Sequence, residues 1–172
     1  MAGKLNPELN LDLYKKVYSY LVKQSGQVTY YQSVRPHLSE SEKSSLIQSV
    51  KANDIYYVQL LALEERYADI LRHVQHRTEL DYGFEKLIEP ILSVYPARCF
   101  VILEKKCWQA IELRGRSVYR MIARWLQLTH EIPGHRNEAE ALTLQFYHHK
   151  PRLPALRDEM RKAGIASSAN YR

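Results

Sequence analysis

Long apolar runs are missing from this chain, and cysteine is scarce. No stretch of about 18 apolar residues occurs, so we expect no membrane span. The two cysteines, Cys99 and Cys107, would lie about 12 Å apart along a continuous helix, too far for a disulfide. We therefore predict buried thiols in a reducing, cytoplasmic compartment. The N-terminal residues lack the apolar core of a secretory signal, and we expect none.

Motifs of the common catalytic and metal sites are also missing. The sequence has no glycine-rich phosphate loop, no serine nucleophile motif and no dinucleotide-binding motif. It has no CxxC, HExxH or HxH pattern either, so we predict no metal ligands and no cofactor. Two histidine pairs, His73 with His76 and His130 with His135, leave metal binding as an alternative. These absences favour a protein without catalytic residues.

Helical patterning dominates what is present. Only six glycines occur among the 172 residues, and the seven prolines fall where helices would end. Apolar residues recur at helical spacing through most of the chain. We therefore predict an all-α, single-domain helical bundle over residues 1–165, with about five to seven helices. A flexible C-terminal tail is expected over residues 166–172.

Helix boundaries follow from capping residues and from residues that break helices. Ser39 and Glu42 have the spacing of a capping box, and the segment after them has neither proline nor glycine. That segment predicts one long helix near residues 40–76, whose weakest point is the stretch 52–54. Gly115 predicts a kink or a break in the basic segment further along the chain.

The segment from Arg98 to His130 carries most of the positive charge. It contains seven basic and two acidic residues, a net charge of +5 out of +6 for the whole chain. In its second half, apolar residues fill one side of a helical wheel, and Arg116, Arg120 and Arg124 lie on the other side. Successive arginines are then about 6 Å apart along the axis, close to the spacing of phosphates on a nucleic acid strand.

This pattern predicts a non-catalytic basic helical subunit that binds the phosphate backbone of RNA or DNA. We expect it to act within a larger nucleoprotein assembly, beside other protein subunits. The predicted nucleic-acid contacts are Arg116, Arg120, Arg124, Lys105, Lys106 and Arg114. One alternative is a solvated helix face whose arginines pair with Glu131, Glu138 and Glu140. Another is a protein-interaction or architectural subunit, which the thirteen tyrosines favour.

Arg124 and His130 permit a third hypothesis, in which the protein is an enzyme. The stretch from one to the other, RWLQLTH, resembles the Arg-x4-6-His pattern of HEPN-type ribonucleases. The resemblance covers seven residues and implies an arginine–histidine pair at a dimer interface that cleaves RNA without a metal. Trp125 stands where that family usually has a polar residue. On a helical wheel the two side chains are about 120° apart, so they converge only if the helix ends near Thr129.

Overall fold

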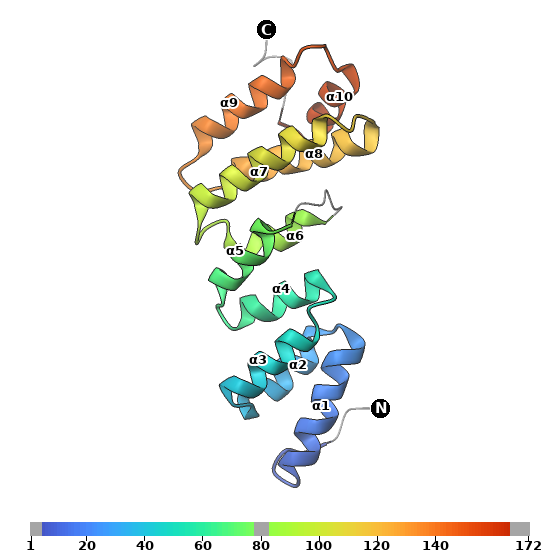
Figure 1. Cartoon of the computed structure of the whole chain (residues 1–172), viewed down its shortest axis with the longest axis vertical. Helices are drawn as coiled ribbons and strands as arrows, with labels where there is room; N and C mark the ends of the chain where they lie inside the picture. Colours follow the sequence, from blue (N-terminus) through green and yellow to red (C-terminus); the bar gives the residue numbers. More distant parts are fainter. Residues whose placement is uncertain (1–4, 78–82, 166–172) are drawn as a thin grey trace. The chain divides into compact units, whose positions relative to one another are not determined.

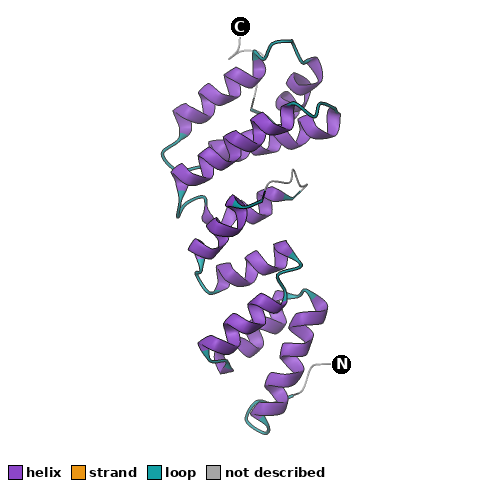
Figure 2. Ribbon diagram, viewed as in Figure 1, coloured by secondary structure: helices purple, strands orange, loops and turns teal. Residues whose placement is uncertain are grey.

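The computed structural model describes residues 5–77 and 83–165 of the chain. Within these ranges every regular element is a helix, and no strand occurs (Figure 1, Figure 2). The predicted all-α class is confirmed. The described residues form ten α-helices and two short 3-10 helices, more than the predicted number, because several predicted helices are divided. None of the described helices is both long and apolar enough to cross a lipid bilayer.

The chain divides into two compact units, Met1–Ile70 and Leu71–Arg172, and the boundary falls inside α5 (Tyr67–Gln75). The residues of each unit pack mainly against other residues of the same unit. A single functional domain over residues 1–165 stays a prediction. The predicted tail, 166–172, lies outside the described residues.

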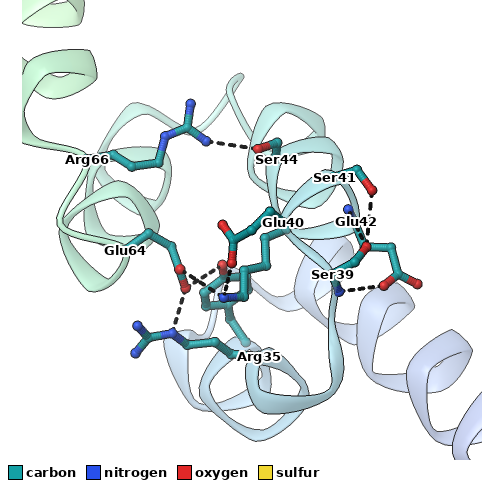
Figure 3. Close-up of polar contacts among 10 residues, drawn as sticks. Arg35, Ser39, Glu40, Ser41, Glu42, Ser44, Glu64 and Arg66 are labelled. Atoms are coloured by element: carbon teal, nitrogen blue, oxygen red, sulfur yellow. Dashed lines mark hydrogen bonds and ion pairs between the residues drawn. The ribbon is translucent and has the colours of Figure 1, made fainter.

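Apart from the start of α5, the first unit is built from four α-helices and one short turn of 3-10 helix. They are α1 (Leu11–Ser25), α2 (Val28–Val34), η1 (Arg35–His37), α3 (Glu40–Ser49) and α4 (Asp54–Leu63). The capping box predicted before α3 is confirmed (Figure 3). Glu42 N donates to Ser39 Oγ at 3.3 Å, and Ser39 N donates to Glu42 Oε2 at 2.7 Å. These two bonds satisfy backbone donors that the first turn of a helix leaves without a partner.

The single helix predicted near residues 40–76 is wrong, because α3, α4 and α5 occupy that stretch. A new helix begins after Asn53, whose side-chain oxygen accepts a hydrogen bond from Tyr56 N at 3.2 Å. That break falls at the predicted weak point. The second break follows Glu65, which adopts a left-handed φ of 55°. Arg66 N then donates to a carbonyl oxygen in the last turn of α4 at 2.9 Å. Glycine is the usual residue in this conformation, so a glutamate gave no signal for the break.

A nearly buried carboxylate ties α2, α3 and α4 together in the first unit. The Glu64 side chain is 9% exposed and accepts a hydrogen bond from Tyr31 Oη at 2.9 Å. It also pairs with Arg35 Nε at 2.6 Å and with Lys43 Nζ at 3.3 Å (Figure 3). Burial and the bond to Glu64 raise the pKa of Tyr31. A carboxylate with these three donors satisfies the requirement that a buried charge be paired.

The second unit contains the basic segment. Its elements after α5 are α6 (Phe84–Ile88), η2 (Glu89–Ile91), α7 (Pro96–Ile111), α8 (Arg116–His130), α9 (Arg136–Tyr147) and α10 (Pro154–Lys162). The break predicted at Gly115 is confirmed, and this glycine has a φ of 106°. α8 packs against α6, α7, α9 and α10 (Figure 1). The side chains of Ile122, Trp125 and Leu126 on α8 are fully buried in this core.

Replacing Asn53 with alanine removes the side-chain cap of α4. We expect Asn53→Ala to lower the free energy of unfolding by about 1 kcal/mol, because a backbone N–H of the first turn loses its acceptor. Urea denaturation followed by circular dichroism measures the change. The control is Gln59→Ala, at an exposed position of the same helix. Equal stability of the two variants would contradict the capping role.

Candidate nucleic-acid interface

The three arginines of α8 lie on its exposed side, as predicted. The side chains of Arg116, Arg120 and Arg124 are 60%, 61% and 61% exposed. The opposite side of the helix is buried, with Trp125 and Leu126 inaccessible to solvent. This amphipathic helix therefore presents three guanidinium groups along one face of the second unit.

Two of these arginines are nevertheless ion-paired to α10. Arg116 Nε donates to Glu159 Oε1 at 2.9 Å, and Arg116 Nη2 pairs with Asp158. Arg120 Nε lies 3.5 Å from Glu159 Oε2. Lys162 Nζ completes the group, 2.9 Å from Asp158 Oδ2 and 3.2 Å from Glu159 Oε1. We call these five residues the α8–α10 cluster. It has three positive and two negative side chains.

Glu159 is the centre of the α8–α10 cluster, because its side chain is only 4% exposed. The hydrogen bond from Arg116 is the main cause that holds the pKa of Glu159 below its ordinary value. The pKa of Asp158 is also lowered, chiefly by Lys162, and the pKa of Arg116 is raised in return. Both carboxylates are therefore ionised at neutral pH. Arg116 and Arg120 thus link α8 to α10 through the side chain of Glu159.

Arg124, Lys105 and Arg114 are less constrained. Arg124 Nη1 lies 3.7 Å from Glu85 Oε1, which is near the limit for an ion pair. Lys105 on α7 and Arg114 in the turn before α8 are exposed. An exposed or loosely held cation gives up little stability when it turns to a new anion. These three residues are therefore the most available of the predicted contacts.

Lys106 lies in the interior, in contrast to its predicted role at the surface. The residue is 3% exposed. Its Nζ donates to the carbonyl oxygen of Arg77 at 3.1 Å and lies 4.4 Å from the centre of the Phe84 ring. A carbonyl oxygen and an aromatic face together stabilise a buried ammonium group. Lys106 thus contributes to packing, while its neighbour in sequence faces solvent.

Two of the carboxylates predicted to neutralise the arginines have other partners. Glu138 Oε1 lies 3.6 Å from His135 Nδ1. Glu140 Oε1 lies 3.1 Å from Arg136 Nε, one turn away on α9. The idea of arginines paired within the chain is therefore supported, but with carboxylates on α6 and α10 instead.

Glu159 had a signal in the sequence that our prediction missed. It lies three residues after Leu156 and one before Met160, and both of these are fully buried. Residues three positions apart share one face of a helix, so Glu159 lies on the same side of α10 as Leu156. A glutamate on an apolar helix face is almost always paired when the helix folds. The spacing of apolar residues therefore predicts a buried carboxylate at Glu159, but it does not predict which arginines pair with it.

Arg124 and His130, the residues of the ribonuclease resemblance, make separate contacts. α8 continues through His130, so the two side chains stay about 120° apart on the helix. His130 Nε2 forms a hydrogen bond with Thr143 Oγ1 at 2.9 Å, and burial lowers the pKa of His130. Arg124 lies beside Glu85 instead. This geometry does not assemble an arginine–histidine pair within the chain.

The cysteines and the possible metal ligands among the described residues form no catalytic or metal site. Cys99 and Cys107 are free, buried thiols, as predicted. Burial raises the pKa of Cys99 to about 11, and it raises that of Cys107 as well. In the ranges that the structure describes, no three His, Cys, Asp or Glu side chains gather to hold a metal ion. No protein-family model, curated protein or solved structure matches this chain.

Replacing Glu159 with glutamine tests the α8–α10 cluster. At pH 7 we expect Glu159→Gln to lower the melting temperature, because three cations lose a buried carboxylate. The pKa of Glu159 is lower in the folded protein than in the unfolded chain, where it is about 4.3. The contribution of this side chain to the free energy of unfolding is therefore present above about pH 4.3, and it is lost as the pH falls through the pKa of the folded state. The difference between wild type and variant should therefore stay nearly constant from pH 7 down to about 4.3 and shrink as the pH falls further.

Thermal melts at a series of pH values measure this difference. The matched control is Glu112→Gln, which removes an exposed carboxylate of the same unit. A difference for Glu159→Gln that stays constant across the series would show that the carboxylate is not held in its ionised form by the cluster.

Proposed function

We propose that this chain is a non-catalytic subunit that binds the phosphate backbone of RNA or DNA through its second unit. The distribution of charge carries the proposal. Residues 71–172 contain seventeen basic and eleven acidic side chains, a net charge of +6. Residues 1–70 contain eight of each, a net charge of zero. The whole positive excess therefore belongs to one unit, and such an excess attracts polyanions.

The α8 arginines support the proposal in spite of their ion pairs. A guanidinium has five N–H donors, and each of these side chains remains about 60% exposed. The cluster has one more positive than negative charge. Its ion pairs keep Arg116 and Arg120 ordered, so a phosphate that binds them immobilises less side-chain freedom. The same pairs reduce the local positive potential. We therefore assign the larger share of binding to Arg124, Lys105 and Arg114.

A protein-interaction role is the second candidate, and a different surface favours it. Leu9, Leu13 and Tyr20 of the first unit are 85%, 45% and 63% exposed. Exposed apolar side chains that gather in one segment are typical of protein contacts. The two roles are compatible, because one concerns the first unit and the other the second. A subunit that joins nucleic acid to other proteins would use both.

Three neutralising substitutions test the phosphate contacts. We expect Lys105→Gln, Arg114→Gln and Arg124→Gln, combined in one variant, to weaken binding to a single-stranded oligonucleotide. The slope of log affinity against log salt concentration should become shallower by about 0.7 for each phosphate that the variant no longer neutralises. Fluorescence anisotropy in a salt series measures both quantities, and circular dichroism verifies the fold.

The control variant removes three positive charges from the first unit, at Lys16, Lys23 and Lys51. All three are exposed. It has the same net charge as the test variant and should retain the wild-type salt slope. Equal weakening in the two variants would mean that total charge alone attracts the oligonucleotide, and the proposed contacts would then be rejected.

Releasing the α8 arginines should strengthen binding. Glu159→Gln removes the carboxylate that Arg116 and Arg120 share, and Glu112→Gln raises the net charge by the same amount at an exposed position. We expect Glu159→Gln to bind the oligonucleotide more tightly than Glu112→Gln, at a temperature where both variants are folded. If the affinity of both variants increases equally, Arg116 and Arg120 take no part in binding.

A further inference from the structure

A groove between α1 and α3 lies in the first unit, which contributes no residue to the proposed phosphate contacts. Its volume is about 440 Å³. α1 contributes three lysines, one serine and one tyrosine to its walls. α3 and the residue before its cap contribute Leu38, Glu42, Ser45 and Leu46. The groove therefore combines an apolar part with hydroxyl groups and positive charge.

The charges in the groove do not balance. Lys15 Nζ lies 3.1 Å from both carboxylate oxygens of Glu42, so this pair is neutral. Glu42 stays ionised, because the backbone N–H of Ser39 and further donors lower its pKa to about 2. Lys16 and Lys23 also line the groove, and both are exposed. Three lysines against one glutamate give the groove a net charge of +2.

An exposed aromatic ring lies between the two exposed lysines. Tyr20 follows Lys16 by four residues and precedes Lys23 by three, so all three share one side of α1. The tyrosine is 63% exposed. Leu13, 45% exposed, lies seven residues before Tyr20 and continues the same side toward the N-terminus of the helix. The buried side of α1 is formed by other residues, such as Val22. Core packing therefore does not account for this second apolar surface.

From this arrangement we infer that the α1–α3 groove binds an acidic peptide segment of another protein. The acidic side chains of the segment pair with Lys16 and Lys23, and an apolar side chain lies on Tyr20 beside Leu38. This inference does not depend on nucleic-acid binding by the second unit.

Charge and surface composition favour a peptide over a polynucleotide as the occupant. The first unit has a net charge of zero, so it lacks the long-range attraction that non-specific phosphate binding needs. Tyr20 instead provides an exposed aromatic side chain, a kind of residue that is enriched among those that dominate affinity at protein interfaces, and Leu13 adds apolar area on the same side of α1. Lysines at the edge of such a surface select the sign of the partner's charge.

Peptide selection from a random library, with the full chain as bait, tests the inference. We expect the enriched peptides to have net negative charge and at least one aromatic or leucine residue. Lys16→Glu with Lys23→Glu should weaken binding of an enriched peptide by about tenfold or more, because two attractions become repulsions. Tyr20→Ser should also weaken it, without any change of charge. The matched control is Lys51→Glu with Lys86→Glu, at exposed positions outside the groove.

Each outcome of these measurements either supports or overturns the inference. Failure of peptide binding in both groove variants, with the control variant unaffected, supports the inference. Enrichment of basic or neutral peptides overturns it, and so does equal binding by the groove variants and wild type. Displacement of the enriched peptide by an oligonucleotide of equal charge, or by vesicles of anionic lipid at matched charge, also overturns it. In that case the groove responds to negative charge alone.

Discussion

The buried carboxylate of Glu159 is the constraint on which the second unit depends. An ionised group that is 4% exposed is tolerated only where cations and hydrogen bonds compensate for its lost hydration. Arg116, Arg120 and Lys162 provide that compensation, and the two arginines in doing so join α8 to α10. Two of the three arginines on the positive face of α8 are therefore already paired within the folded protein. A polyanion that approaches it competes with a carboxylate already in place.

The first unit also contains a nearly buried carboxylate, Glu64, whose charge is compensated by neighbouring donors. Tyr31, Arg35 and Lys43 surround that carboxylate, much as the cations of α8 and α10 surround the one in the second unit. The difference lies in what remains after pairing. Basic and acidic side chains are equal in number in the first unit, whereas the second has an excess of six positive charges. Equivalent internal ion pairs thus accompany two different electrostatic surfaces, which is the physical basis for proposing a different partner for each.

Much of the helical architecture was predictable because its causes are local. The capping box at Ser39 and the break at Gly115 involve residues a few positions apart, so the sequence displays them directly. The amphipathic pattern of α8 is local as well. The break at Glu65 was not predictable, because glycine is the usual residue in a left-handed conformation and this position is a glutamate. Lys106 was assigned to the surface for a related reason: neighbouring lysines on a helix point in different directions, and packing selects the one that is buried.

By itself the sequence determined the all-helical class, the buried thiols and a helix with three arginines opposite its apolar face. Only the tertiary structure decided what those arginines contact. Arg116 and Glu159 are 43 residues apart in the chain, and nothing in helical periodicity links them. Helix formation reflects interactions within one or two turns, whereas the pairing of charges depends on which helices the apolar faces bring together. The availability of a basic face to a partner is therefore a property of packing.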